Sequence, residues 1–173
     1  MIREFTISVF TENHTGILSR VVSVFTRRHI NIESLTVSRS SMEGIHRFTI
    51  VVNVTEELVR KLVSQLDKQI EVLKAFHYSS DEVVYQEIAL YKVPISAMQN
   101  GNSIEMLLRK HHARIIDVAP EYVVIEKTGH QDETEALRDE LGEYNIYEFV
   151  RSGRVAVVKP LEQLSKYLAS VEE

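Results

Sequence analysis

The chain of 173 residues contains no cysteine. This absence excludes disulfide bonds, zinc sites with thiolate ligands, iron–sulfur clusters held by cysteine, and cysteine nucleophiles. Whatever the protein does, it does without cysteine ligands or thiolate chemistry.

Long apolar runs are also missing, since no stretch approaches the ~20 residues that a membrane-spanning helix needs. The first residues, Met1–Glu4, lead directly into a strand-like pattern without the apolar segment of a signal peptide. We therefore expect a cytoplasmic protein that does not engage a membrane.

Glycine is scarce, with six residues, and the sequence lacks the glycine-rich phosphate loops G-x-G-x-x-G and G-x-x-x-x-G-K-[ST]. It also lacks the G-x-S-x-G nucleophile elbow.

The net charge of −5 argues against non-specific binding of nucleic acid, which requires excess positive charge. His111 and His112 are neighbours, and on a helix adjacent side chains point about 100° apart. We expect no catalytic residue and no metal site.

What the sequence does contain is a regular succession of amphipathic patterns. Phe5, Ile7 and Val9 alternate with polar residues, which is typical of a half-buried strand. From Ile17 the apolar spacing becomes helical, with Ile17, Leu18, Val21, Val22 and Phe25 on one stripe. Further patterns predict strands over 30–37, 48–54 and 70–78 and a helix over 56–66 capped by Thr55. The order is βαββαβ.

The same order begins again after the polar segment Ser79–Glu82. Strand patterns start at Ile88 and cover 113–119, 122–127, 144–150 and 154–159, with a short helix expected at 161–171. Capping-box sequences at Asn102 and Asp132 predict the starts of two helices, and Gly142 suits the end of the second. The fold class is therefore α+β, with two tandem ferredoxin-like βαββαβ modules at 1–79 and 83–173. Modules this small bury little surface, so each needs the other or a second subunit.

The loop between the first strand and the first helix, Asn13-His14-Thr15-Gly16-Ile17-Leu18, has two interpretations. In the simpler one, Asn13 or Thr15 caps the helix and Gly16 permits a tight turn. In the other, the free N–H groups at the helix start bind a carboxylate, and Asn13 binds the ammonium group of the same amino acid.

Two strings around this loop are specific. The first is Glu12-Asn13-x-x-Gly16-x-Leu18-Ser19-Arg20-Val21, followed by Phe25 and Arg27-Arg28, and the second is Asn31-Ile32-Glu33-Ser34-Leu35-Thr36-Val37. With these strings the chain resembles the family of small regulatory subunits of acetolactate (acetohydroxyacid) synthase, and residues 1–79 are similar to its ACT domain. The second half resembles the family mainly through residues 114–118 and 150–153.

The resemblance implies a non-catalytic subunit. In this family the large subunit carries thiamine diphosphate, magnesium and FAD, so no cofactor is expected in this chain. The small subunit activates the large one and confers feedback inhibition by a branched-chain amino acid, usually valine. The effector lies between the ACT domains of a homodimer, and the resemblance assigns to it the residues Asn13, Gly16, Ile17 and Leu18 of one chain and Asn31 and Ile32 of the other.

This chain departs from the family at three positions near that site. Thr15 stands where proline is frequent, His29 occupies a position near a common glycine, and Ile17 is larger than the alanine of some members. The identity of the effector is therefore left open.

Three other classes of protein share the fold. A stand-alone tandem-ACT amino-acid sensor, which would act on transcription or another enzyme, shares the loop but lacks the string 31–37. A ferredoxin-like RNA binder needs basic character and an aromatic strand motif, which residues 47–51 do not supply. An acylphosphatase-like enzyme needs an arginine in the first loop, and residues 13–16 contain none.

Overall fold

The computed structural model describes residues 1–99 and 103–159. Contacts divide the chain into two units, one formed by Met1–Tyr85 together with the segment that begins at Arg154, and the other by Gln86–Gly153. The chain thus passes twice from one unit to the other. Sequence patterning placed the segment 154–159 with the second module, whereas its contacts place it with the first.

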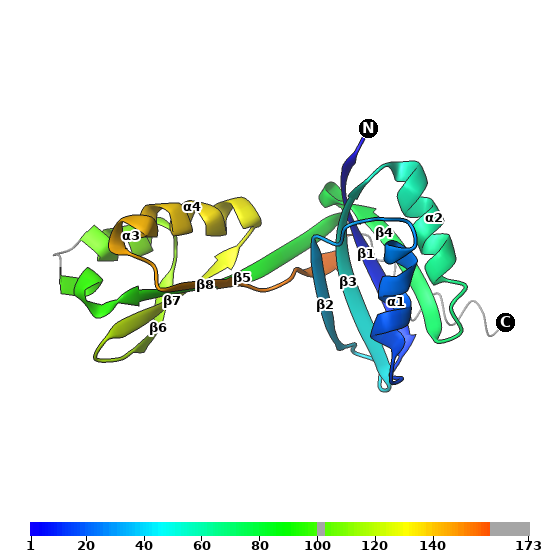
Figure 1. Ribbon diagram of the computed structural model, residues 1–173, viewed down its shortest axis with the longest axis horizontal. Coiled ribbons are helices and arrows are strands. Elements are labelled where there is room, and N and C mark those ends of the chain that lie inside the picture. The colour runs from blue at the N-terminus through cyan, green and yellow to red at the C-terminus, as the bar shows by residue number, and fades with distance from the viewer. Residues whose placement is uncertain (100–102, 160–173) are drawn as a thin grey trace. The chain divides into compact units, whose positions relative to one another are not determined.

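The first unit contains one four-stranded antiparallel sheet in the order β2-β3-β1-β4. Its elements are β1 (Arg3–Glu12), α1 (Ile17–Thr26), β2 (Ser34–Arg39), β3 (Ile45–Val54), α2 (Glu56–Leu66) and β4 (Val72–Ser79) (Figure 1). This confirms the βαββαβ order of a ferredoxin-like module. Thr55 caps α2 as predicted, since its side chain accepts a hydrogen bond from the N–H of Leu58.

Both helices cover the same face of this sheet, and the core lies between them and the strands. The alternating residues Phe5, Ile7 and Val9 are at most 2% exposed and belong to one cluster with the buried faces of α1 and α2. The buried stripe of α1 consists of Ile17, Val21, Val24 and Phe25. Leu18, which we expected in this stripe, is 46% exposed, although Phe25, seven residues later on the same side of the helix, is fully buried. Leu18 lies in the first turn, at the N-terminal end of α1.

The connection from α1 to β2 is longer than predicted. We expected a strand from residue 30, but β2 begins at Ser34. The N–H of Ile30 donates to the carbonyl of Phe25, so this residue ends the helix instead of joining the sheet. His29 adopts a left-handed conformation with φ of 54° to make this turn.

The second unit repeats the topology of the first, with strand order β6-β7-β5-β8. Its elements are β5 (Val83–Pro94), α3 (Ser103–Lys110), β6 (Arg114–Val118), β7 (Tyr122–Gly129), α4 (Gln131–Leu141) and β8 (Glu148–Arg151). A ninth strand, β9 (Val155–Val158), lies in the segment that contacts assign to the first unit, and it pairs with β5, which begins in that unit. The duplicated α+β architecture is therefore confirmed. Burial raises the pKa of Tyr91 in this core to about 12, and its hydroxyl donates to the carbonyl of Thr134 at 2.6 Å.

The start of α4 differs from the prediction by two residues. His130, not Asp132, is the N-terminal cap, and its N–H donates to the Glu133 carboxylate at 2.7 Å. A capping box needs an acidic residue three positions after the cap. Glu133 stands three positions after His130 and accepts its N–H, whereas the prediction paired Asp132 with Glu135. Gly142 ends the helix as expected. The predicted cap at Asn102 and the predicted helix at 161–171 lie outside the described residues.

Among the described residues, the longest helices are α2 and α4, with 11 residues each. Within residues 1–99 and 103–159, no helix combines the length and apolar character needed to cross a membrane.

Replacement of His29 by glycine should stabilise the protein. A side chain at φ of 54° is strained and glycine is not, so His29→Gly should raise the free energy of unfolding by about 0.5–1 kcal/mol. Chemical denaturation of the two proteins measures the difference. His46→Gly is the matched control, because His46 lies in β3, where glycine weakens a strand, and its stability should fall. A loss of stability in His29→Gly would contradict the argument.

Candidate functional site

The loop between β1 and α1 leaves the start of α1 without a side-chain cap. The N-terminal cap of the helix is Gly16, which has φ of 87° and ψ of −3° and accordingly offers no side-chain acceptor. The simpler interpretation of the loop, in which Asn13 or Thr15 caps the helix, is therefore wrong. A left-handed residue is needed at this point, and glycine adopts that conformation without strain.

The free N–H groups at this end of α1 are the main chemical feature of the loop. The N–H of Ile17 donates to the carbonyl of His14 at 3.2 Å. Within the described part of the chain, the N–H groups of Gly16, Leu18 and Ser19 have no acceptor. They lie at the positive end of the helix dipole, where a carboxylate binds favourably. Ser19 was not among the predicted site residues, and it becomes recognisable once the helix is counted from Gly16 as its cap.

The side chains around these amides differ in exposure. Asn13 and Leu18 are exposed, and the N–H of Asn13 donates to the carbonyl of Gly44 at 3.2 Å. Ile17, in contrast, is 6% exposed and packs into the core of the first unit. Of the two apolar residues that the resemblance assigns to the effector in this loop, only Leu18 therefore presents its side chain at the surface.

Asn31 and Ile32 lie at the opposite end of the same sheet. Helix α1 has 10 residues, and it carries the chain about 15 Å away from the loop before these residues are reached. Asn31 is exposed, with its side-chain amide 3.4 Å from the Glu33 carboxylate, while Ile32 is half-buried against the core. One chain therefore does not bring Asn13 and Asn31 together.

A cavity of about 230 Å³ lies beside the loop, at the turn between β2 and β3. It is lined by Asn13, Arg39, Ser40, Met42, Glu43, Gly44, Ile45 and His46. Arg39 and His46 are opposite each other in the β2–β3 pairing, so both belong to this end of the sheet. These two residues were not predicted, because only the strand register brings them next to Asn13.

A cavity of about 640 Å³ lies elsewhere, along α2. Ion pairs between residues one turn apart, Glu56 with Arg60 and Glu57 with Lys61, satisfy most of its charged lining. Despite its larger volume, this surface has no feature that selects a ligand, and we place the functional site at the loop.

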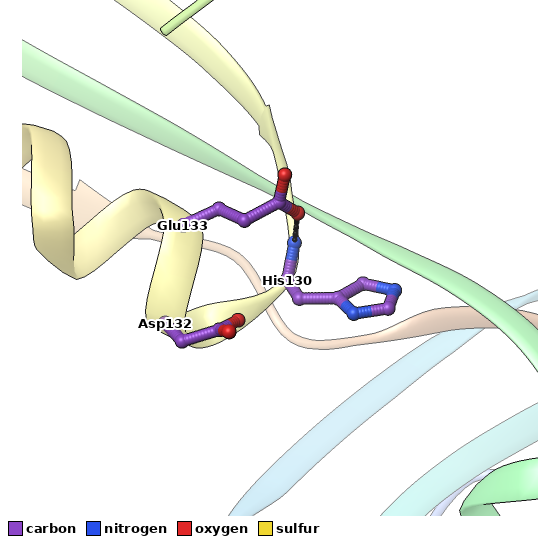
Figure 2. A group of neighbouring side chains, drawn as sticks. All are labelled: His130, Asp132 and Glu133. Carbon is purple, nitrogen blue, oxygen red and sulfur yellow. Dashed lines mark hydrogen bonds between the residues drawn. The ribbon is translucent and has the colours of Figure 1, made fainter.

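Three potential metal ligands come together at the start of α4. His130, Asp132 and Glu133 offer ligand atoms within 4.8 Å of one another. Figure 2 shows the Glu133 carboxylate at the backbone N–H of His130, where it closes the helix cap. Acidic residues in the first turn of a helix are favoured by its dipole, so helix capping accounts for the group.

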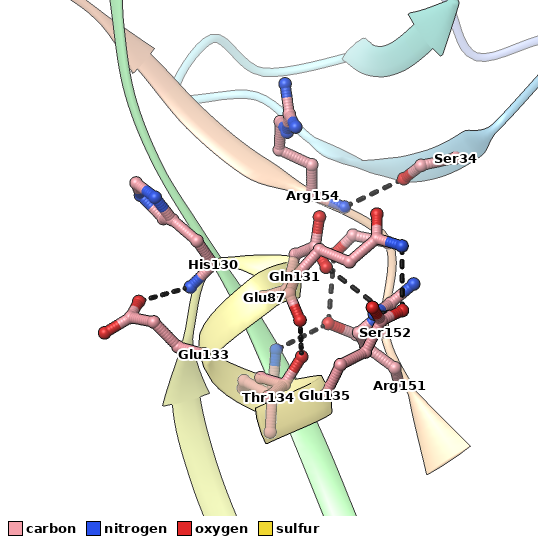
Figure 3. Close-up of polar contacts among 12 residues, drawn as sticks. Ser34, Glu87, His130, Gln131, Glu133, Thr134, Glu135, Arg151, Ser152 and Arg154 are labelled. Atoms are coloured by element: carbon pink, nitrogen blue, oxygen red, sulfur yellow. Dashed lines mark hydrogen bonds and ion pairs between the residues drawn. The ribbon is translucent and has the colours of Figure 1, made fainter. Parts of the chain in front are cut away.

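The second unit also contains a buried ion pair, shown in Figure 3. Glu87 is 5% exposed and lies 3.2 Å from the guanidinium of Arg151, which also contacts Glu135 at 3.1 Å. Hydrogen bonds from Gln131 and then Arg151 lower the pKa of the Glu135 carboxyl. Both carboxylates have a cationic partner, so they join β5, α4 and β8 and are not poised for acid–base chemistry.

Comparison with known proteins identifies relatives along most of the chain. A family model described as an AHAS small subunit-like ACT domain matches residues 7–74, and one described as the small subunit of acetolactate synthase matches residues 86–160. A probable acetolactate synthase small subunit of Archaeoglobus fulgidus is 38% identical over 154 residues, which cover 89% of this chain and 96% of the relative. The acetolactate synthase small subunit of Bacillus subtilis is 37% identical over 158 residues, 91% of each chain.

A solved structure agrees with these sequence matches. The acetolactate synthase small subunit of Thermotoga maritima has a TM-score of 0.84 and 31% identity, and the match covers 93% of this chain and 100% of that one. The similarity thus extends over both units and is not confined to the β1–α1 loop.

Replacement of Gly16 by alanine should strain the loop without any steric clash. A Cβ atom at Gly16 would meet no atom within 4 Å, so the cost comes from the φ of 87° alone. We expect Gly16→Ala to lower the free energy of unfolding by about 1 kcal/mol, measured by urea denaturation. Gly142→Ala is the matched control, because Gly142 also has open space but a helical φ of −55°, so its stability should stay equal or rise. Equal stabilities of the two variants would contradict the role of the left-handed cap.

Proposed function

Because this chain belongs to the acetolactate synthase small-subunit family, we propose that it is a non-catalytic subunit that binds and activates a thiamine-diphosphate-dependent large subunit. In the same proposal it confers feedback inhibition by a branched-chain amino acid, with valine as the first candidate. Thiamine diphosphate, magnesium and FAD belong to the large subunit, and this chain contributes regulation.

The observation that carries the proposal is the uncapped start of α1. The free amides of Gly16, Leu18 and Ser19 suit the carboxylate of an amino acid, and the exposed side-chain oxygen of Asn13 suits its ammonium group. Leu18 supplies an exposed apolar surface for an aliphatic side chain. The small cavity beside Asn13 is consistent with a ligand of this size.

The effector site requires two chains in this proposal. Asn31 and Ile32 precede β2, which is an edge strand of the sheet and pairs with β3 on one side. Among the described residues its other edge has no strand partner, and such an edge can pair with the same edge of a second copy. A two-fold axis at this edge places the loop of one chain against Asn31 and Ile32 of the other.

Regulation then follows from linkage. An amino acid held by two chains stabilises one arrangement of the homodimer, and the large subunit prefers another arrangement. A coupling free energy of about 1–3 kcal/mol between the two binding events changes each binding affinity by about 5- to 150-fold. By linkage, the effector weakens binding of the large subunit by the same factor by which the large subunit weakens effector binding.

Asn13→Ala should reduce sensitivity to valine in the complex reconstituted with the large subunit. The substitution removes the group that binds the ammonium ion, and loss of a charged hydrogen bond should raise the half-inhibitory concentration about tenfold. Activation without valine should be retained. Asn53→Ala is the control, because Asn53 is an exposed asparagine of β3 in the same unit. Unchanged inhibition in Asn13→Ala would exclude this effector site.

Co-expression with the large subunit tests the proposed partner separately. The two chains should purify as one complex, and acetolactate formation by the large subunit should increase when this chain is present. Binding of valine without any complex would instead favour the stand-alone amino-acid sensor. That outcome would overturn the assignment as a regulatory subunit.

A further inference from the structure

Arg154 is the most deeply buried arginine among the described residues, and its side chain makes several polar contacts. The residue is 3% exposed, and its Nη1 atom lies 2.9 Å from the Thr6 hydroxyl and 2.9 Å from the Glu4 carboxylate. Its guanidinium also packs over the ring of Tyr85, 3.6 Å from the centroid. A buried charge is tolerated only with such partners, so the position of this side chain is closely defined.

The backbone of Arg154 contacts a different strand from its side chain. Its N–H donates to the Ser34 hydroxyl at 3.0 Å, as Figure 3 shows. Ser34 in β2 is opposite Val51 in β3, and Val51 is opposite Thr6 in β1. Arg154 therefore joins the two outer members of one row of residues that crosses three strands.

This row lies on the sheet face that the helices do not cover. Phe5 and Ile50, the neighbours of Thr6 and Val51, point into the helix-covered core, so alternation directs Thr6 and Val51 to the other side. Even so, Val51 is only 2% exposed and Thr6 only 1%. The segment that starts at Arg154 belongs to this unit by its contacts and helps to complete that face.

The β2 end of the row is next to the candidate effector residues. Ser34 is the first residue of β2 and follows Ile32 by two positions. Between them, the N–H of Glu33 donates to the carbonyl of Val51 at 2.9 Å, so the residue before Ser34 is held by the same row. Because Asn31 and Ile32 lie directly before this point in the chain, a displacement of Ser34 would also displace them.

From this placement we propose that Arg154 is a positioning residue for the effector site. By bonding Ser34 through its backbone and Glu4 and Thr6 through its side chain, it fixes the segment 31–33 relative to β1. The inference rests on the proposed function, because Asn31 and Ile32 matter to a ligand only if the chain binds an effector. Arg154 itself touches no ligand.

The test compares four variants of the full chain. Arg154→Met keeps an unbranched side chain but removes every guanidinium contact. Arg154→Lys keeps the charge near Glu4 but lacks the planar fork and the flat stacking on Tyr85. Ser34→Ala removes only the acceptor for the Arg154 N–H. Arg151→Met is the matched control, since it deletes another ion-paired arginine three positions earlier whose carboxylate partners, Glu87 and Glu135, lie in the second unit.

The first measurement is valine binding by isothermal titration calorimetry. We expect the Kd of Arg154→Met to rise about fivefold or more, Arg154→Lys and Ser34→Ala to give smaller increases, and Arg151→Met to bind as the unsubstituted chain does. Equal Kd values in Arg154→Met and the unsubstituted chain would overturn the proposal. Equal weakening in Arg154→Met and Arg151→Met would also overturn it, because that pattern indicates a general loss of stability.

The second measurement is hydrogen exchange without any ligand. In Arg154→Met the amides of residues 31–36 should exchange faster, while those of α4 keep their protection. Uniformly faster exchange, or no change at 31–36, contradicts a positioning role. If Arg154→Met does not fold, Arg154→Lys and Ser34→Ala decide both measurements. If the unsubstituted chain binds none of valine, leucine and isoleucine, the proposed feedback inhibition fails, and the exchange data still decide whether Arg154 positions this segment.

Discussion

The direction of α1 is the constraint on which the candidate site depends. The helix must cross the sheet face to bury Val21, Val24 and Phe25, so its N-terminus and the residues after its C-terminus lie at opposite ends of the sheet. Only the N-terminus has the positive dipole end and the free amides. Under the proposed function, each chain therefore supplies two separate parts of the effector site, and only assembly of two chains completes it.

The two units use the same topology in different ways. In the second unit, the Glu133 carboxylate bonds the cap residue of α4, and in the first unit Thr55 caps α2. At α1 the cap is Gly16, which contributes no side chain and leaves the first turn open. The same scaffold thus occurs twice, and among the described starts of α1, α2 and α4 only that of α1 has neither a side-chain cap nor a capping box.

Periodicity predicted the order of elements in both units because alternation and helical spacing express which side chains are buried. It failed where individual hydrogen bonds decide the outcome. His130 starts α4 two residues earlier than expected because Glu133 can reach its N–H, and Ile30 leaves the strand because its N–H closes the end of α1. The contact of Arg154 with Thr6 spans 148 positions, and no local pattern can predict it. The loop residues were found from their motif, while the burial of Ile17 and the exposure of Leu18 required the three-dimensional packing.

The position of Arg154 gives the order of synthesis a physical meaning. Residues 1–85 contain all four strands of the first sheet, yet the partner of Glu4 and Thr6 is added only after the whole of Gln86–Gly153 has been made. A nascent chain that ends before residue 154 holds this sheet with one face incompletely covered. The first unit thus reaches its final state only after the second has been synthesised. Residues 1–85 alone do not contain every residue that the first unit needs.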